Sequence, residues 1–177
     1  MKKIFALFLM MSLAVFAYDV TGVNVKFTAF KTFAKKGVDG GFDSVEFSGK
    51  KGAATIPEML NGLSVSIKTK SVNSGNPERD QKLVNAFFNT QFNHEIQAKI
   101  VEVKEDTVLV EIVMNNETVR VPMAYQMKDK NISATGYIDL ADFKMLPSLQ
   151  SINKACYDLH EGKTWQDVAI TFSLNFE

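Results

Sequence analysis

The sequence is poor in the residues that mark several common protein classes. Its 177 residues include one Cys, four Pro, one Trp and two His, and 20 Lys and Arg balance 20 Asp and Glu. A single Cys cannot form an intrachain disulfide, so the fold must be stabilised by its core. The even charge balance excludes both a basic nucleic-acid-binding surface and an acidic disordered tail. With 46% apolar residues, the chain has enough hydrophobic material for one sizeable domain.

Patterns of catalytic or metal-binding residues are also scarce. His94 and His160 are the only histidines, and no usual metal-ligand spacing surrounds either one. Cys156 stands four residues before His160, but a c-type haem site needs a second Cys and another spacing. We interpret Cys156 as a small apolar residue on a helix and expect the Cys156–His160 pair at the surface. The sequence therefore predicts no catalytic residues, no metal site and no enzyme activity.

The first 17 residues have the pattern of a secretory signal peptide. Lys2 and Lys3 give a positive start, residues 4–15 are apolar apart from Ser12, and Ala17 ends a possible cleavage motif. The apolar run is shorter than the roughly 20 residues that span a bilayer, so a retained anchor is the less favoured alternative. The sequence thus predicts cleavage after Ala17 and an exported domain over residues 18–177, with a net charge of 18 − 20 = −2.

Beyond that segment, apolar residues recur at every second position, which is typical of half-buried antiparallel strands. We predict about eight strands, at residues 23–29, 42–47, 63–69, 96–100, 108–114, 119–127, 132–140 and 168–176. Polar clusters at 104–106, 115–116 and 129–131 predict hairpin turns, and Asp39-Gly40-Gly41 is interpreted as another turn. About eight strands joined by hairpins favour a mainly β fold, either a sandwich or a closed barrel.

Two amphipathic helices interrupt the predicted strands. Asn76 and Pro77 supply a cap and a first helical residue, and an apolar stripe then continues to Phe88. A second stripe runs from Leu149 to Leu159, before Gly162. We expect both helices to cover a barrel end or the sheet surface.

One segment resembles a known protein family. The strand that ends at Thr69 is followed by Ser-Val-Asn-Ser-Gly-Asn, then Glu-Arg-Asp and a double Phe at 87–88. This segment is similar to the signature of the YceI-like family, exported bacterial proteins whose lipocalin-like barrel binds isoprenoid-type lipids. Tyr18-Asp19-Val20, Gly40-Gly41-Phe42 and the segment from Trp165 to Ile170 also resemble that family. Two features depart from it: Lys82 stands where members often have His, and the helix at 148–161 is longer than usual.

The resemblance implies a periplasmic protein that binds, transports or stores a long amphiphilic lipid, such as an isoprenoid or a quinone. Inward-facing small residues (Ala29, Thr69, Ala98, Ala134, Gly136) predict room inside a barrel of this size. Met114, Met123 and Met127 would give a deformable lining. The expected ligand-binding residues of the interior are Phe27, Ile67, Ala98, Ile112, Met114, Met123, Tyr125, Ala134 and Phe172. Asn76, Arg79 and Asp80 are the expected head-group residues at the mouth, although a helix cap and surface ion pair explain them equally well.

Three other interpretations remain open. The ligand could be a fatty acid or fatty amide, with no other cofactor than the bound lipid. A quinone-linked redox accessory would have to use Cys156, His94 or His160. A stress-response or surface module would have a solid barrel without a ligand. We expect no nucleic-acid partner; exposed strand edges are compatible with a homodimer, and a lipid carrier would contact the inner membrane transiently.

Asn131 is a predicted glycosylation site. The segment Asp129-Lys130-Asn131-Ile132-Ser133 contains the acceptor pattern Asn-x-Ser, with an acid two residues upstream as in the bacterial periplasmic form. Asn116 has the short pattern in a comparable turn but follows Met114 instead of an acid. We expect both turns to be exposed, and modification at Asn131 only.

Overall fold

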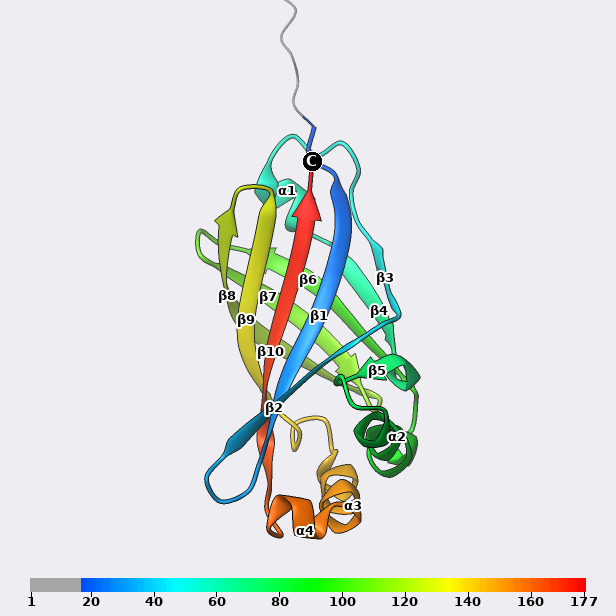
Figure 1. Cartoon of the computed structure of the whole chain (residues 1–177). Coiled ribbons are helices and arrows are strands. Elements are labelled where there is room, and N and C mark those ends of the chain that lie inside the picture. Colours follow the sequence, from blue (N-terminus) through cyan, green and yellow to red (C-terminus); the bar gives the residue numbers. More distant parts are fainter. Residues whose placement is uncertain (1–16) are drawn as a thin grey trace, which may run out of the picture.

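The computed structural model describes residues 17–177, so the predicted signal peptide lies outside the described residues apart from Ala17. One antiparallel sheet curls into a half-barrel (Figure 1). Its strand order is β3-β4-β6-β7-β8-β9-β10-β1-β2-β5. The strands are β1 (Val20–Lys31), β2 (Lys36–Phe42), β3 (Val45–Ser48), β4 (Ser64–Lys68), β5 (Val72–Asn73), β6 (Glu95–Val103), β7 (Thr107–Met114), β8 (Glu117–Lys128), β9 (Asn131–Asp139) and β10 (Thr164–Phe176).

The predicted mainly β, antiparallel fold is confirmed, with ten strands instead of about eight. The strand predicted at 42–47 is the junction between β2 and β3, which separate at Asp43 and Ser44. β5 has only two residues and is too short to show a period of two. Turns at 104–106, 115–116 and 129–130 are confirmed, and Asn115, Asn116 and Asp129 adopt the positive φ angles that such tight turns require.

The predicted turn at Asp39-Gly40-Gly41 is wrong, because these residues lie inside β2 and pair with β1. Gly40 is opposite Phe27, and a Cβ atom added to Gly40 would lie 2.5 Å from Cζ of that ring. The glycine therefore lets an aromatic ring lie flat against the neighbouring strand. Gly40 is needed because its missing side chain lets the ring of Phe27 approach, whereas the sequence suggested a glycine that supplies the conformational freedom of a turn.

The helices lie at the two ends of the half-barrel (Figure 1). α1 (Ile56–Leu60), which the sequence pattern did not predict, lies at one end, and α2 (Pro77–Ala86), α3 (Leu146–Ala155) and α4 (Tyr157–His160) gather at the other. Short 3-10 turns, η1 (Thr69–Ser71) and η2 (Phe88–Thr90), precede β5 and follow α2. The predicted helix at 149–159 is two helices, because the backbone breaks at Cys156 with φ −127°.

The end that carries α1 is packed solid. Met59 and Leu60 of α1 and Leu63 after it are at most 1% exposed and join one buried cluster with Leu174 and Phe176 of β10. Tyr18 pairs with Ala53 and stacks edge-on against Phe176, with ring centroids 5.9 Å apart. This end of the half-barrel is closed by side chains, so space for a ligand must lie toward α2 and α3.

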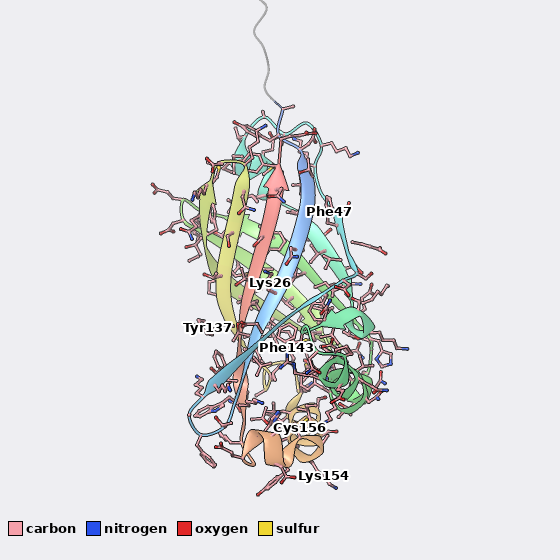
Figure 2. The ribbon with its side chains drawn as sticks, viewed as in Figure 1. Lys26, Phe47, Tyr137, Phe143, Lys154 and Cys156 are labelled. Carbon is pink, nitrogen blue, oxygen red and sulfur yellow. The ribbon has the colours of Figure 1, made fainter. Side chains whose placement is uncertain are left out.

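The two edges of the sheet are β3 and β5. Phe47 on β3 is 40% exposed, and Figure 2 shows it on the side of the half-barrel. A homodimer through such an edge stays a prediction. Among residues 17–177, none of the helices has the length and apolar character that a membrane crossing demands.

Candidate ligand-binding cavity

A cavity of about 220 Å³ lies between the sheet and the helices α2 and α3. This volume exceeds that of an engineered apolar cavity of about 150 Å³ that stays dry and takes up benzene. The alternative of a solid barrel predicted a filled interior, and the cavity contradicts it. The apolar lining comes from the inner faces of the strands and from the helices: Val25, Phe27, Ala29, Val38, Phe42, Leu63, Val65, Ile67, Leu83, Phe87, Phe88, Ile96, Ala98, Ile100, Val110, Ile112, Met114, Met123, Ile138, Leu140, Leu149, Ile152, Val168, Ile170 and Phe172.

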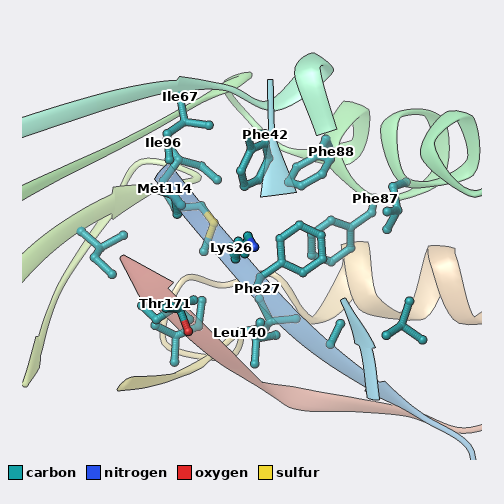
Figure 3. Close-up of a pocket in the computed structure, with 18 of the residues that line it drawn as sticks. Lys26, Phe27, Phe42, Ile67, Phe87, Phe88, Ile96, Met114, Leu140 and Thr171 are labelled. Atoms are coloured by element: carbon teal, nitrogen blue, oxygen red, sulfur yellow. The ribbon is translucent and has the colours of Figure 1, made fainter. Parts of the chain in front are cut away.

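Four phenylalanines form a continuous wall between the sheet and α2 (Figure 3). The ring centroids of Phe27 and Phe42 are 5.7 Å apart, those of Phe42 and Phe88 6.0 Å, and those of Phe88 and Phe87 5.1 Å. These tilted and edge-on contacts are the favoured arrangement for aromatic rings. Because each ring is supported by the next, the wall presents rigid apolar surface to the cavity.

Seven of the nine predicted interior residues line this cavity: Phe27, Ile67, Ala98, Ile112, Met114, Met123 and Phe172. Tyr125 and Ala134 do not. They pair with each other on β8 and β9, and Oη of Tyr125 donates a hydrogen bond to the carbonyl of Lys104 in the β6–β7 turn, 3.1 Å away. Both instead belong to the packed part of the half-barrel, Ala134 as a member of the buried core cluster and Tyr125 packed against it.

The small residues that predicted a channel also fall into two groups, those that line the cavity and those that do not. Ala29 and Ala98 line the cavity. Thr69 is fully buried, and its hydroxyl donates to the carbonyl of His94. A Cβ atom on Gly136 would lie 2.9 Å from Cγ of Met123, so this methionine fills the space beside the glycine. The expectation for Met127 is wrong, since its side chain is 55% exposed at the end of β8.

The three predicted mouth residues build the turn that begins α2. Oδ1 of Asn76 accepts from the backbone N–H of Arg79 at 3.0 Å and caps the helix. Ser74 joins the other two residues, because its Oγ donates to the carboxylate of Asp80 and accepts from Nε of Arg79 at 2.8 Å. A second guanidinium nitrogen of Arg79 donates to the carbonyl of Ser74 at 2.7 Å. The predicted surface ion pair between Arg79 and Asp80 is absent among the described residues, and both instead bind Ser74.

Of these three, only Arg79 lines the cavity. Its guanidinium has five N–H donors, of which the contacts with Ser74 use two. The rest can face a ligand. Asn76 and Asp80 have structural roles instead, as the cap and as the carboxylate that holds the preceding loop.

The end of the cavity next to α2 and α4, which we call its mouth, contains basic groups that the sequence analysis, apart from Arg79, did not assign to a head-group site. Lys31 at the end of β1, Lys82 on α2 and His160 at the end of α4 line it together with Arg79. Burial lowers the pKa of His160, and the positive charges of Lys31 and Lys82 lower it further. Alternating positions in the sequence identify inward faces of strands, but they do not show which loops and helix ends meet at a barrel mouth.

Cys156 and His160 are not on the surface, contrary to the prediction. Cys156 is 8% exposed, and Figure 2 shows it among the helices at the hollow end. His160 is half-buried, and both residues line the cavity. Nδ1 of His160 lies 3.0 Å from Oγ1 of Thr164, the first residue of β10. Such a contact between elements could not be read from the apolar pattern of the helix alone. Within residues 17–177, no group of three or more His, Cys, Asp or Glu side chains is arranged to hold a metal ion.

The prediction for Asn131 needs one correction. The residue begins β9 and is half-buried, whereas Asn116 is exposed. Nδ2 of Asn131 donates to the carbonyl of Leu174 at 3.1 Å and to Oδ1 of Asn175 at 3.0 Å. Glycosylation at Asn131 stays a prediction, but the acceptor nitrogen is engaged by β10 in the folded chain.

Comparison with known proteins supports this architecture. The family model described as a YceI-like domain matches residues 16–176. A polyisoprenoid binding domain from Saccharophagus degradans, implicated in plant cell wall breakdown, has a TM-score of 0.65 at 15% identity and covers 91% of this chain and 98% of its own. BcnA of Burkholderia cenocepacia has a TM-score of 0.61 at 14% identity, covering 88% and 96%.

The YCEI protein of Campylobacter jejuni is also similar, with a TM-score of 0.51 at 19% identity over 67% of this chain and 77% of that one. At these identities the similarity concerns the fold. None of the curated proteins compared with the chain matches it.

Proposed function

The chain belongs to the family of YceI-like domains, and from this premise we propose that it binds a long amphiphilic lipid in its cavity. The observation that carries the proposal is the apolar cavity itself, which is lined by residues of β1, α2 and α4 and by members of the buried core cluster such as Leu63. With a volume of about 220 Å³ and an almost wholly apolar lining, the cavity has room for part of an apolar chain.

Burial of the lipid chain supplies the binding free energy. Each methylene moved from water into an apolar site contributes roughly 0.8 kcal/mol, so about ten contribute up to about 8 kcal/mol before the cost of ordering the ligand. A Kd of 1 μM corresponds to about 8.2 kcal/mol, so a longer buried chain or contacts with the head group must offset the ordering cost.

An isoprenoid or quinone chain is the proposed ligand class, and a fatty acid or fatty amide is the second. The similar fold of the polyisoprenoid binding domain from Saccharophagus degradans supports the first class. The thioethers of Met114 and Met123 suit the methyl branches of an isoprenoid, because methionine adapts to irregular apolar shapes. A fatty chain uses the same wall with fewer contacts.

The proposed location is the periplasm, where the protein would carry or store the lipid. The predicted signal peptide supports export. A fusion of residues 1–20 to a reporter that is active only outside the cytoplasm tests it. We expect export of the fusion and none after replacement of Leu7, Leu9 and Leu13 by Asp; equal export of both fusions would contradict the assignment.

The ligand can be identified directly. The protein is purified from its native host without detergent, and the organic extract is analysed by mass spectrometry. We expect one class of long-chain lipid at close to one molecule per chain. A protein that carries no lipid and binds neither isoprenoid nor fatty ligands in vitro would overturn the proposed function.

We propose that binding involves no covalent chemistry. The one observation that favours a redox accessory instead is that Cys156 and His160 line the cavity, while His94 is exposed elsewhere. Substitution Cys156→Ser combined with His94→Gln and His160→Asn separates the two functions. Binding and cellular phenotype should persist in this variant, and loss of phenotype with intact binding would favour the redox function.

Transient contact with the inner membrane is the proposed route of lipid exchange. Phe33 in the β1–β2 hairpin is 74% exposed, and Tyr157 and Leu159 on α4 are 63% and 61% exposed. The indole N–H of Trp165, close to α4, donates to the carbonyl of Thr32, which brings the hairpin to the same end (Figure 1). Exposed aromatic and leucine side chains around the mouth suit insertion between lipid head groups.

Vesicle flotation tests this contact. Wild-type protein should float in part with vesicles of phosphatidylglycerol and phosphatidylethanolamine, and the variant Phe33→Ser with Leu159→Ser should stay in solution. Tyr137→Ser removes an aromatic side chain that is 69% exposed on β9 and serves as the control. Equal flotation of all three proteins would contradict the proposed route.

A further inference from the structure

We propose that the mouth of the cavity binds the anionic head group of the lipid, a phosphate or a carboxylate, through Lys31, Arg79 and Lys82. This inference rests on the proposed function and names the chemistry of its ligand. Within the proposed isoprenoid class it favours a prenyl phosphate over a neutral quinone. Within the fatty class it favours an acid over an amide.

The first observation is the sign of the charges. No Asp or Glu side chain lines the cavity, whereas Lys31, Arg79 and Lys82 do. Each ion pair formed by residues 17–177 involves some other basic residue, so Lys31 and Lys82 have no direct carboxylate partner there, and Arg79 reaches the carboxylate of Asp80 only through Oγ of Ser74. Lys26 and Lys99 also border the cavity, but they alternate with inward-facing neighbours on β1 and β6, whereas Lys31 and Arg79 are half-buried and the exposed Lys82 extends from α2 beside them. The uncompensated charge is therefore concentrated at the mouth.

The second observation is that separate elements bring these groups together. Lys31 is the last residue of β1, Lys82 lies on the second turn of α2, and His160 ends α4. Lys31 and Lys82 both lie near enough to His160 for their charges to lower its pKa. Like charges that converge without a counter-ion repel one another, and an anion placed between them removes that cost.

The hydrogen bonds around His160 fix the direction of its free nitrogen. Nδ1 lies 3.0 Å from Oγ1 of Thr164, whose single proton is donated to Oδ1 of Asn153 at 2.8 Å. Nδ2 of Asn153 donates to the carbonyl of Gly162, which fixes the orientation of that amide. Thr164 can then only accept from His160, so Nδ1 carries the proton and Nε2 is free. On protonation, Nε2 becomes a charged donor beside the two lysines.

The third observation is what lies behind the charges. The apolar wall of Phe27, Phe42, Phe87 and Phe88 (Figure 3) lines the same cavity as the basic groups, and Phe87 and Phe88 follow α2, which carries Arg79 and Lys82. A small inorganic anion would leave this wall in contact with water, while a neutral lipid would leave the cations unpaired. An amphiphile with an anionic head and a long apolar tail satisfies both parts of the cavity at once.

Matched pairs of lipids test the inference. Geranylgeranyl phosphate is compared with geranylgeraniol, and palmitate with hexadecanol, each below its critical micelle concentration and followed by isothermal titration calorimetry at neutral pH. We expect the anionic member of at least one pair to bind about tenfold tighter or more than its alcohol, since a hydrogen bond to a charged group contributes about 1.5–3 kcal/mol. The pair with the larger ratio identifies phosphate or carboxylate as the head group.

The variant Lys31→Gln with Lys82→Gln should reduce this ratio several-fold without weakening the alcohols, because Arg79 is left as the only cation of the three. Lys154→Gln is the matched control, because Lys154 is exposed on the outside of α3 at the same end of the molecule (Figure 2). Equal affinity of the wild type for acid and alcohol in both pairs would overturn the head-group site while leaving lipid binding intact. An unchanged ratio in the double variant would also overturn it. Failure to bind all four lipids would overturn the proposed function itself.

Discussion

Gly40 faces the ring of Phe27 so closely that it tolerates no side chain without movement of the aromatic wall. We predict that Gly40→Ala lowers the free energy of unfolding by about 1–3 kcal/mol, the usual cost of overpacking. Gly22→Ala is the control, since the nearest atom to its added Cβ is 4.0 Å away. Urea denaturation measures both variants. Equal midpoints for the two would show that the ring of Phe27 gives way freely.

His160 makes the stability of the ligand-free protein depend on pH. Lys31 of β1 and Lys82 of α2 face it, Arg79 lines the same mouth, and Thr164 of β10 occupies its Nδ1. Because burial and these cations lower its pKa in the folded state, the unfolded chain binds the proton more readily. The contribution to stability is present above the unfolded pKa of about 6.5 and is lost as pH falls through the lower, folded value.

We therefore predict that the ligand-free wild type loses stability between about pH 7.5 and 5.5, and that His160→Asn loses less over this range. The pKa values of Glu58 and Glu95 are also lowered, by hydrogen bonds to Lys50 and Ser66 respectively, but these groups titrate below the window. Chemical denaturation at several pH values gives the slopes. Parallel slopes for the two proteins would contradict the role of His160.

At the scale of elements, the loop before α2 depends on the carboxylate of Asp80, which accepts from both the backbone N–H and the hydroxyl of Ser74. We predict that Asp80→Ala costs about 1–3 kcal/mol, because the half-buried donors of Ser74 lose their acceptor. Glu78→Ala, which removes an exposed acid from the same helical turn, should cost less. Thermal denaturation compares the two. If Asp80→Ala reduced the free energy of lipid binding by more than the free energy of unfolding, Asp80 would be a head-group residue.

The hydrogen bonds of Asn131 lead to a prediction about whether glycosylation comes before or after folding. Its acceptor nitrogen is bonded to β10, so glycosylation must precede the pairing of β9 with β10. In a host with the periplasmic machinery, the protein should carry a glycan that Asn131→Gln removes, and the folded, unmodified protein should be a poor acceptor in vitro. Intact mass decides both points. Modification at Asn116 instead would show that exposure matters more than the upstream acid.

The elements that the sequence pattern missed are short or determined by a partner strand. β2 contains three glycines and pairs with β1 because the ring of Phe27 covers Gly40, a contact that no local pattern reveals. α1 has only five residues, too few for a helical period. Its signal was present as a capping box, in which Oγ1 of Thr55 accepts from the N–H of Glu58 and the carboxylate of Glu58 accepts from Ala54.

At the scale of the whole molecule, the cavity predicts that a substitution can change lipid affinity without changing the stability of the fold. Ala98→Leu places a larger side chain in the cavity and should weaken lipid binding several-fold without a loss of stability, since the added atoms fill existing space. Ala124→Leu adds the same atoms to the exposed face of β8 as a control. Tryptophan fluorescence titration and thermal denaturation follow the two effects. Unchanged lipid affinity in Ala98→Leu would place the ligand elsewhere.

The site was predictable from the sequence only in part, for a geometric reason. A period of two shows which residues point inward, and it correctly placed Phe27, Ala98 and Met114 along the cavity. The period carries no information about position along the axis of the half-barrel. Tyr125 and Ala134, which pair with each other, were therefore assigned to the cavity although they do not line it. The basic mouth arises from loops and helix ends that only the complete fold brings together.

The pairing of β1 with β10 also governs how the molecule folds. Val25 is opposite Phe172, so the contact between them closes a loop of nearly the entire domain. Pairings between residues so distant in the chain form late and slowly, because the entropy of the loop is lost before the strands gain their contacts. Both strands line the cavity, and the binding site therefore cannot exist in any folding intermediate that lacks β10. A lipid can therefore bind in this cavity only after β1 and β10 have come together.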